Sequence, residues 1–263
     1  MTCLVPKVLD LDSLIRLRPP KGVDRFKKDY LVYIIHLVTE IPGMDRSLEY
    51  EHGFVPIHAA TVQRVVKNYN QYLTYLINAG VLISDGQYVP GRKSKGYQFA
   101  GAYRGAVRSV YLTDTKLIKK LKPKPLSATS QRRYRHLTKW FNIDLSIRYD
   151  LALNFLQQDL DRKVRNPALQ DRELRTLKRK DPYTQYNHAR VAIEKFSAAA
   201  FHISIDNKGF RLHSLLSNMR SDLRNCLTYN GLELVSIDIC NSQPYILQLL
   251  LQMDFWDSYY NTP

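Results

Sequence analysis

Hydrophobic residues recur with helical spacing along the first third of the chain. Apolar side chains three and four positions apart predict helices over residues 22–40, 59–66 and 69–79. The segment Ile41-Pro42-Gly43 is expected to end the first of these helices, because proline and glycine are poor helix formers. Gly80 follows the third helix, where glycine commonly takes the left-handed conformation that closes a helix.

The remainder of the chain alternates between the same helical spacing and short β-prone runs. These elements predict an α+β protein that is mostly helical. The expected helices cover residues 147–164, 183–201 and 212–227, the expected strands cover residues 202–206 and 232–237, and a hairpin is expected over residues 81–99.

The net charge of +15 is concentrated in one segment. Residues 86–143 hold fourteen Lys and Arg against the single carboxylate of Asp114, a net of +13. Residues 1–85 (ten basic, nine acidic) and 144–263 (fifteen basic, fourteen acidic) each carry only +1. Dense positive charge attracts polyanions by releasing their counterions, so we expect a nucleic-acid partner. A solvated basic linker is the alternative, and no amphipathic helix spans the segment to favour a membrane surface.

No segment of the sequence predicts export or membrane insertion. The N-terminal residues lack a basic start followed by a sustained apolar core, and the longest apolar runs are too short to cross a bilayer. Cys3, Cys226 and Cys240 have no paired spacing, which argues against a disulfide scaffold or a cysteine zinc site. We therefore expect a cytoplasmic location, the interior of a host cell.

Two helices followed by a basic hairpin resemble the winged-helix domain. In particular, Asn78-Ala79-Gly80-Val81-Leu82 followed by Gly91-Arg92-Lys93-Ser94-Lys95-Gly96-Tyr97 is similar to replication proteins of phages and plasmids. The resemblance covers roughly residues 25–105 and implies that the second helix enters a DNA major groove while the hairpin holds phosphates. A winged helix that serves protein contacts is the alternative. The implied base-contacting residues are Asn68, Asn70, Gln71 and Thr74, and the implied phosphate-contacting residues are Arg92, Lys93 and Lys95.

The segment of residues 116–135 has the composition of a linker, because Pro123, Pro125 and Ser127 interrupt a run of cations. A charged linker can follow a nucleic-acid backbone while Tyr134 or Trp140 stacks on bases. The expected organisation is a winged-helix domain (1–105), a basic linker (106–145) and a helical domain (146–263). Candidate phosphate contacts in the linker are Lys119, Lys120, Arg132, Arg133 and Arg135.

Two further cations lie on the helix expected over residues 212–227. Arg220 and Arg224 are one helical turn apart, a spacing that allows both guanidinium groups to grip one phosphate. A solvated cationic face is the alternative for this pair.

The segment of residues 234–247 places one carboxylate between a strand and a helix. Asp238 ends the β-prone run, and Pro244 stands where the first turn of a helix is expected, with Asn241 or Ser242 as its cap. A carboxylate beside a helix N-terminus suits a divalent metal together with its phosphate. The alternative is that Asp238 only caps the helix.

The same segment is similar to the first palm motif of single-subunit polymerases, the phage-type RNA polymerases and family A DNA polymerases. The resemblance implies that Asp238 binds Mg²⁺, that Asn241, Ser242 and Gln243 form the polar turn after it, and that Arg211 matches an arginine upstream. Metal-assisted phosphoryl transfer would follow, with Arg211, Arg220 and Arg224 placing template or triphosphate. A two-metal site needs a second carboxylate so that its metals lie ~4 Å apart, and only Asp254 and Asp257 follow. A complete polymerase site therefore requires further chain after residue 263.

These observations support a nucleic-acid-binding replication or transcription protein of a phage or mobile element, with DNA favoured over RNA. It is expected to form the N-terminal part of a single-subunit polymerase if further chain follows. The alternative is a non-catalytic winged-helix replication initiator or transcriptional repressor. A structural RNA-binding protein is a third hypothesis, which preferential binding of single strands or hairpins would favour.

Overall fold

The structure is a computed structural model that describes residues 1–44, 53–123, 125–172, 179–206, 208–209, 211–235, 237, 244, 247–248 and 251. The chain divides into two compact units, Met1–Glu233 and Leu234–Pro263, and all of the helices and strands named below belong to the first unit. About 49 % of the described residues are helical and 16 % lie in strands, which confirms the predicted α+β class with mostly helical content.

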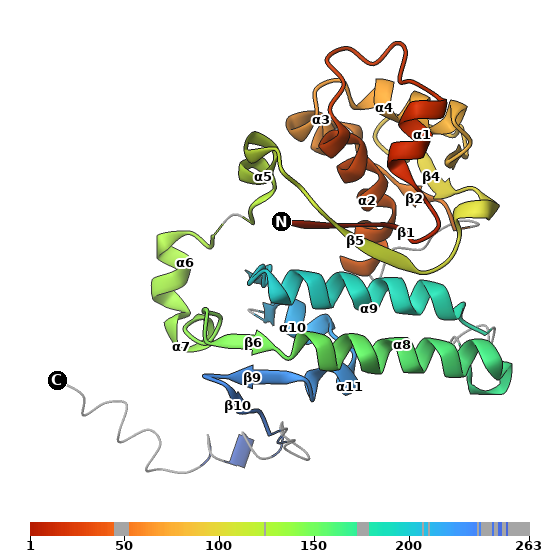
Figure 1. Cartoon of the computed structure of the whole chain (residues 1–263). Helices are drawn as coiled ribbons and strands as arrows, with labels where there is room; N and C mark the ends of the chain where they lie inside the picture. The colour runs from red at the N-terminus through yellow and green to blue at the C-terminus, as the bar shows by residue number, and fades with distance from the viewer. Residues whose placement is uncertain are drawn as a thin grey trace. The chain divides into compact units, whose positions relative to one another are not determined.

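Helices and a small sheet form the N-terminal part of the first unit (Figure 1). α2 (Lys28–Met44) is followed by β2 (Val55–Pro56), α3 (Ala59–Val65) and α4 (Tyr69–Asn78). β3 (Leu82–Ser84) and β4 (Gly96–Phe99) form an antiparallel hairpin, and β2 pairs with the other side of β4, which gives the strand order β2-β4-β3. The structure thus confirms the predicted two short helices, the predicted hairpin and the left-handed conformation of Gly80 (φ +72°).

One apolar stripe from each helix builds the core of this part. Leu31 and Ile35 of α2 and Tyr72 and Leu76 of α4 are completely buried. Full burial of such a side chain contributes about 2 kcal/mol, so helical spacing of the apolar residues is the main reason that these helices meet. α1 (Leu11–Leu17) joins the same core; the side chain of Asp10 caps it by accepting from the N–H groups of Asp12 and Ser13.

α2 extends beyond its predicted end. Ile41-Pro42-Gly43 was expected to stop the helix, but Pro42 lies inside it and Met44 is its last residue. The reason is tertiary packing, because Gly43 fits closely against α9 (Pro182–Ser197). A Cβ atom at Gly43 would lie 3.0 Å from the Cβ of Val191. This close contact outweighs the hydrogen bond that proline cannot donate.

A two-stranded ribbon joins the N-terminal part to the rest of the unit. β1 (Thr2–Pro6) pairs antiparallel with β5 (Val107–Tyr111), from Thr2 opposite Tyr111 to Pro6 opposite Val107. Side chains alternate across the ribbon, so that Cys3 and Val5 enter the first core while Leu4 enters a second core.

α5 (Thr115–Leu121) follows the ribbon and is capped by Asp114, whose side chain accepts from the N–H of Leu117. Leu117 is completely buried in the first core. Residues 107–121 therefore form a packed strand and helix, which corrects the predicted linker at this position. The linker prediction gave weight to the cations and missed the apolar residues between them.

The second core lies between α8 (Tyr149–Arg165), α9 and a three-stranded antiparallel sheet of order β10-β9-β6 (Figure 1). α8 and α9 match the helices predicted over residues 147–164 and 183–201 in type and approximate position. None of the described helices is long and apolar enough to cross a membrane. The remaining elements in this part are α6 (Ala128–Arg133), α7 (Arg135–Thr138), β6 (Leu145–Ile147), the 3-10 helix η3 (Pro167–Leu169), β7 (Ser204–Ile205), β8 (Leu212–His213), α10 (Leu215–Asn218), α11 (Ser221–Arg224), β9 (Leu227–Tyr229) and β10 (Leu232–Glu233).

The single helix predicted over residues 212–227 does not form. This stretch contains β8, α10, α11 and the start of β9. Ser214 and Ser217 make a reciprocal capping box that starts α10, and the extended backbone of Met219 and Arg220 (ψ 146° and 140°) separates it from α11. The apolar stripe nevertheless identified the buried side chains, because Leu215, Met219, Leu223 and Cys226 all lie in the second core.

Candidate nucleic-acid interface and neighbouring polar clusters

The outer face of α4 is exposed and carries no charge. Asn70, Gln71, Thr74 and Asn78 are exposed along it, while Tyr72, Leu73 and Leu76 face the core. Amide and hydroxyl side chains of this kind can donate and accept hydrogen bonds at base edges. The structure thus presents Asn70, Gln71 and Thr74 together, as the sequence predicted.

A basic loop that sequence reasoning missed lies beside this face. Asn68 Nδ2 donates to the carbonyl of Asp24 (2.8 Å), Gln71 Oε1 accepts from the N–H of Asp24 (3.0 Å), and the Tyr75 hydroxyl donates to the carbonyl of Arg18 (2.8 Å). Asn68 and Gln71 therefore hold the loop in place as well as bordering the exposed face. The composition Arg18-Pro19-Pro20-Lys21-Gly22, a proline- and glycine-rich turn between cations, was the available signal.

Loop and helix together enclose a groove of about 410 Å³. Its walls combine cations from the loop with neutral polar side chains from α4. The residues that line it include Arg18, Lys21, Asn70, Gln71, Thr74 and Asn78.

The β3–β4 hairpin presents two of its three predicted cations to solvent. Arg92 and Lys95 are exposed. Lys93 instead turns toward the base of the hairpin, where its Nζ donates to Gln87 Oε1 (2.5 Å) and lies 3.7 Å from Asp85 Oδ2. Asp85 also accepts from the N–H of Gly96 (2.9 Å), so it fixes both arms of the hairpin. Lys93 is therefore better described as a residue that supports the hairpin.

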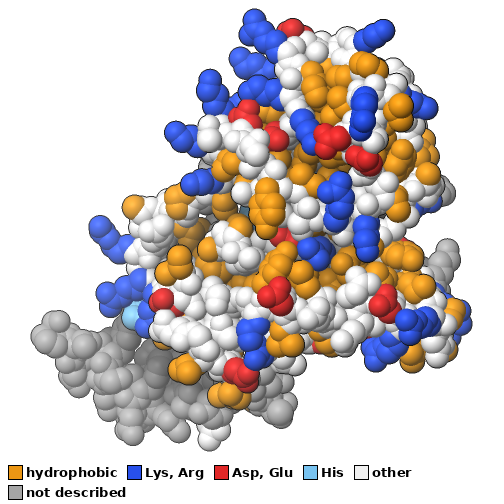
Figure 2. Space-filling model, viewed as in Figure 1, with side chains coloured by type: hydrophobic (Ala, Val, Ile, Leu, Met, Phe, Trp, Pro, Cys, Tyr) orange, Lys and Arg blue, Asp and Glu red, His pale blue; other side chains and the backbone are white. Residues whose placement is uncertain are grey.

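Blue Lys and Arg side chains follow the left side of the first unit in Figure 2, the side on which Figure 1 places α5, α6 and α7. Among the cations of these helices, Lys119, Arg132, Arg133 and Arg135 are exposed. Lys120 is also exposed, but its Nζ donates to the carbonyl of Val65 (2.8 Å) at the end of α3. A cation at a helix C-terminus is favourable, so Lys120 has a capping role within the fold.

Arg220 is withdrawn from solvent into an ion-pair cluster, which corrects its prediction as a phosphate contact. Its Nη2 lies 3.0 Å from Asp159 Oδ2 and 2.5 Å from Asp222 Oδ2. Arg224 is exposed, and its guanidinium donates to the carbonyl of Met219 (3.1 Å from Nη2). Arg220 is the N-cap of α11 and Arg224 is its last residue, but their guanidinium groups have separate partners within the fold, so they do not form the predicted clamp.

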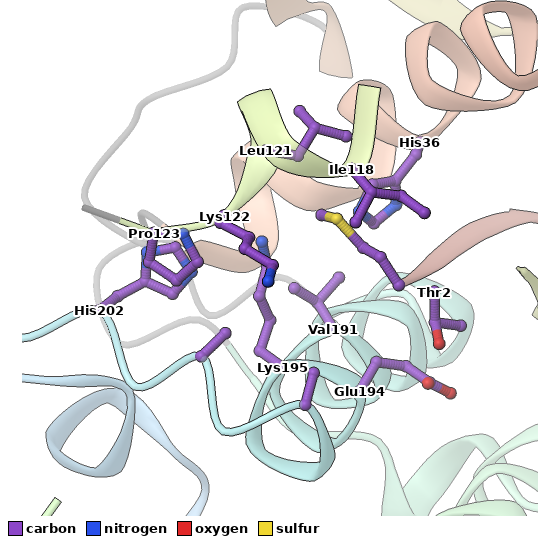
Figure 3. A pocket seen from close by; sticks show the side chains of 13 residues that line it. Thr2, His36, Ile118, Leu121, Lys122, Pro123, Val191, Glu194, Lys195 and His202 are labelled. Carbon is purple, nitrogen blue, oxygen red and sulfur yellow. The ribbon is translucent and has the colours of Figure 1, made fainter. Parts of the chain in front are cut away.

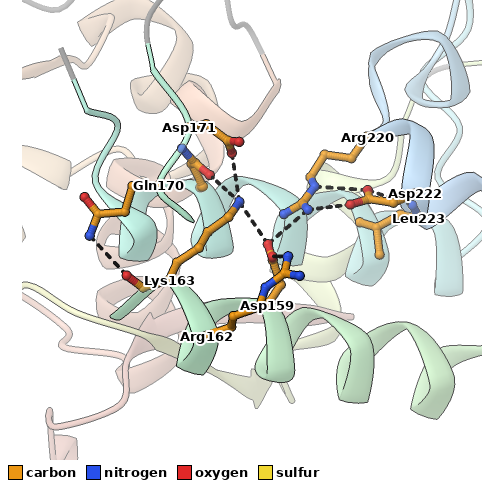
Figure 4. Close-up of polar contacts among 9 residues, drawn as sticks. Asp159, Arg162, Lys163, Gln170, Asp171, Arg220, Asp222 and Leu223 are labelled. Carbon is orange, nitrogen blue, oxygen red and sulfur yellow. Dashed lines mark hydrogen bonds and ion pairs between the residues drawn. The ribbon is translucent and has the colours of Figure 1, made fainter. Parts of the chain in front are cut away.

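Asp159 is the centre of this ion-pair cluster (Figure 4). Its Oδ2 atom contacts Lys163 Nζ (3.1 Å) as well as Arg220, and its Oδ1 atom accepts from Arg162 Nη2 (2.9 Å). Burial alone would raise the pKa of Asp159, but the three cations outweigh it and hold the pKa below its usual value. Lys163 also contacts Asp171 (2.8 Å). The cluster joins α8 to α11 and to the chain segment after α8.

A second buried cluster lies beside a cavity of about 220 Å³ between β1, α5 and α9 (Figure 3). Lys195 of α9 lines the cavity and forms an ion pair with Glu40 of α2. His36 Nδ1 accepts from the N–H of Leu4 (3.0 Å), and its Nε2 lies 3.6 Å from the other oxygen of Glu40. Because Nδ1 accepts from Leu4, a proton on this ring lies on Nε2, the nitrogen that faces Glu40, and burial lowers the pKa of His36.

The pKa of Glu40 reports the charge balance in this cluster. Burial alone would raise it, but His36 and Lys195 outweigh burial and lower the pKa to about 2. Glu40 is therefore ionised at neutral pH and compensates the charge of Lys195. The ion pair connects α2 of the first core with α9 of the second core.

The residues of the polymerase-like segment are only partly described. Arg211 is exposed at the β7–β8 hairpin, where its N–H donates to Asp206 Oδ2 (3.2 Å). Asp238, Asn241, Ser242 and Gln243 lie outside the described residues. Within the described part of the chain, no three His, Cys, Asp or Glu side chains converge as metal ligands.

Comparison of the chain with protein-family models, with curated proteins and with solved structures finds no match.

Proposed function

We propose that the chain binds duplex DNA as a winged-helix protein, through α4, the β3–β4 hairpin and the loop of residues 18–24. The observation that carries the proposal is the arrangement of α2, β2, α3, α4 and the β3–β4 hairpin with strand order β2-β4-β3. A helix–turn–helix completed by a basic hairpin fits this arrangement, and α4 takes the position of the recognition helix.

The chemistry of the exposed surface supports this assignment. A major groove about 12 Å wide admits one helix, and its base edges offer hydrogen-bond donors and acceptors. Asn70, Thr74 and Asn78 provide matching neutral groups on α4. Cations flank them: Arg18 and Lys21 lie along one side of the groove on α4, and Arg92 and Lys95 project from the hairpin. Initiators and repressors both use this division between base and phosphate contacts.

Removing the exposed hairpin cations is expected to weaken duplex binding and its salt dependence. The double variant Arg92→Ala/Lys95→Ala should lose affinity on the order of tenfold at low salt and flatten the slope of log K against log[salt] by about 2, because two phosphate contacts are lost. Fluorescence anisotropy with a labelled duplex across a salt series measures both quantities.

The matched control is Arg165→Ala/Lys180→Ala, which removes two exposed cations near the ends of α8 and α9. It changes the net charge equally and should leave the slope close to that of the wild type. An equal effect in both variants would mean that binding follows net charge alone, and would contradict a wing.

The α4 side chains are expected to determine sequence preference. After selection of preferred sequences from a random duplex library, Asn70→Ala/Thr74→Ala should weaken binding of the selected duplex by about 1–3 kcal/mol per lost base contact. Its binding of an unrelated duplex should remain unchanged, because phosphate contacts come from other residues. The ratio of the two affinities is the readout, and an unchanged ratio would remove α4 as the recognition helix.

A further inference from the structure

A second groove lies between α6–α7 and the turn after α9. Its volume is about 540 Å³, and its lining is amphipathic. Polar and charged groups come from Gln131, Arg135, Thr138 and Lys139, whereas the apolar part includes Leu126, Phe141 and Phe201. A groove with apolar walls and cations at its rim fits a planar base with an attached phosphate.

The charge around this groove is of one sign. Residues 115–143 contain nine Lys and Arg and no Asp or Glu. Arg132, Arg135 and Lys139 are exposed, and none of them forms an ion pair with any residue that the structure describes. α6 and α7 contain no buried residue, so their side chains lie at the surface.

The aromatic residues of the groove are held in fixed positions. The Phe141 ring meets the Phe201 ring edge to face with centroids 5.8 Å apart, and Phe201 meets Phe196 in the same way at 5.2 Å. Trp140, next to the lining residue Phe141, is 51 % exposed, although its ring makes an edge contact with Tyr229 and has Lys139 Nζ 4.5 Å from its centroid. A half-exposed, anchored tryptophan next to cations is suited to stacking on a base.

We infer that this groove, formed by α6, α7 and residues 199–203, binds single-stranded nucleic acid. One unpaired base would enter the groove beside Phe141, Arg135 and Lys139 would contact the adjoining phosphates, and Trp140 would stack on a neighbouring base. Single strands fit because a duplex keeps its base faces covered by stacking. The site is separate from α4 and the β3–β4 hairpin, so it stands or fails independently of the duplex-binding proposal.

The test uses the full chain with the substitution Trp256→Phe. The sequence has two tryptophans, so the remaining tryptophan emission then comes from Trp140. A labelled 20-nucleotide oligothymidylate reports affinity by anisotropy, and unlabelled oligothymidylate reports stacking by quenching of Trp140 emission. Inorganic polyphosphate is the comparison, because it offers phosphates without bases. Arg135→Ala/Lys139→Ala tests the groove, and Arg165→Ala/Lys180→Ala, near the ends of α8 and α9, is the control with the same change of charge.

We expect the groove variant to weaken oligothymidylate binding on the order of tenfold, whereas the control variant should change it less than about threefold. Trp140 emission should fall with oligothymidylate and stay constant with polyphosphate. Equal losses in the two variants, equal quenching by polyphosphate, or unchanged emission at saturating oligothymidylate would each overturn the proposal. Loss of duplex binding in Arg92→Ala/Lys95→Ala has no bearing on these outcomes.

Discussion

Replacing Asp159 by Asn should lower the free energy of unfolding by about 3 kcal/mol, because it removes the one carboxylate shared by three cations. Lys163 is buried, with 4 % of its surface exposed, and would keep its charge with fewer partners. The loss of stability is not larger because Lys163 keeps its contacts with Asp171 and Gln185. Arg220 likewise keeps its contact with Asp222. In a chain of this size the change corresponds to a decrease of about 6–12 °C in Tm.

Urea denaturation at pH 7 measures this effect directly. The matched control is Asp161→Asn, two residues further along α8, where the carboxylate is exposed and bonded only to Gln157 (2.9 Å) among the described residues. We expect the control to change stability by less than about 0.5 kcal/mol. If Asp159→Asn and Asp161→Asn were equally stable, the cluster in Figure 4 would contribute nothing to the fold.

Replacing Glu40 by Gln is expected to have a comparable effect on the contact between α2 and α9. The carboxylate compensates Lys195, whose side chain is 12 % exposed, so the variant leaves a nearly buried ammonium group unpaired. The lowering of the Glu40 pKa from 4.5 to about 2 corresponds to about 3 kcal/mol of stability at neutral pH.

The pH dependence follows from the same shift. Because the folded-state pKa of Glu40 lies below the unfolded value of 4.5, the folded state binds fewer protons in this range. The stabilisation is fully present above pH 4.5 and is lost as the pH falls toward 2. Wild type should therefore lose more stability than Glu40→Gln between these two pH values, as measured by urea midpoints at successive pH.

Two further variants identify the source of the effect. Glu233→Gln removes the partner of Arg148 in an ion pair whose carboxylate side chain is 71 % exposed, and should cost less than about 1 kcal/mol. Glu40→Gln/Lys195→Met removes the unpaired charge together with its partner, and should recover part of the lost stability. A double variant no more stable than Glu40→Gln alone would show that lost packing, not an unpaired charge, is the cause.

The sequence correctly predicted the helices and the hairpin that are marked by residues close together in the chain. Apolar spacing and Gly80 located α3, α4 and the β3–β4 hairpin, and helical periodicity located α8 and α9. These features depend on residues a few positions apart, which is why a single sequence was sufficient to predict them. The same reasoning placed Asn70 and Thr74 on an exposed face and Arg92 and Lys95 on the hairpin.

The incorrect predictions involve contacts between distant residues. Nothing near Pro42 indicates that Gly43 will meet Val191, and nothing near Val107 indicates that it will pair with Pro6. The helix expected over residues 212–227 had the correct periodicity, but Arg220, at the break between α10 and α11, pairs with Asp159, 61 residues away. The serine capping box that starts α10 is a local signal that the prediction missed. Candidate site residues were misjudged for the same reason. Lys93, Lys120 and Arg220 are cations with partners inside the fold, and a sequence pattern cannot separate them from cations that remain free for a ligand.

The pairing of β1 with β5 has a consequence for the order of events during synthesis. Residues 2–6 leave the ribosome about 5–20 s before their partners, residues 107–111, at ordinary elongation rates. Throughout this interval an apolar strand with unpaired backbone groups is exposed, although the helices and hairpin between the two strands can already form. The second core cannot be completed before the ribbon closes, because Leu4 is one of its buried members. The nascent chain therefore carries an aggregation-prone segment, whose backbone groups stay unpaired until β1 pairs with β5.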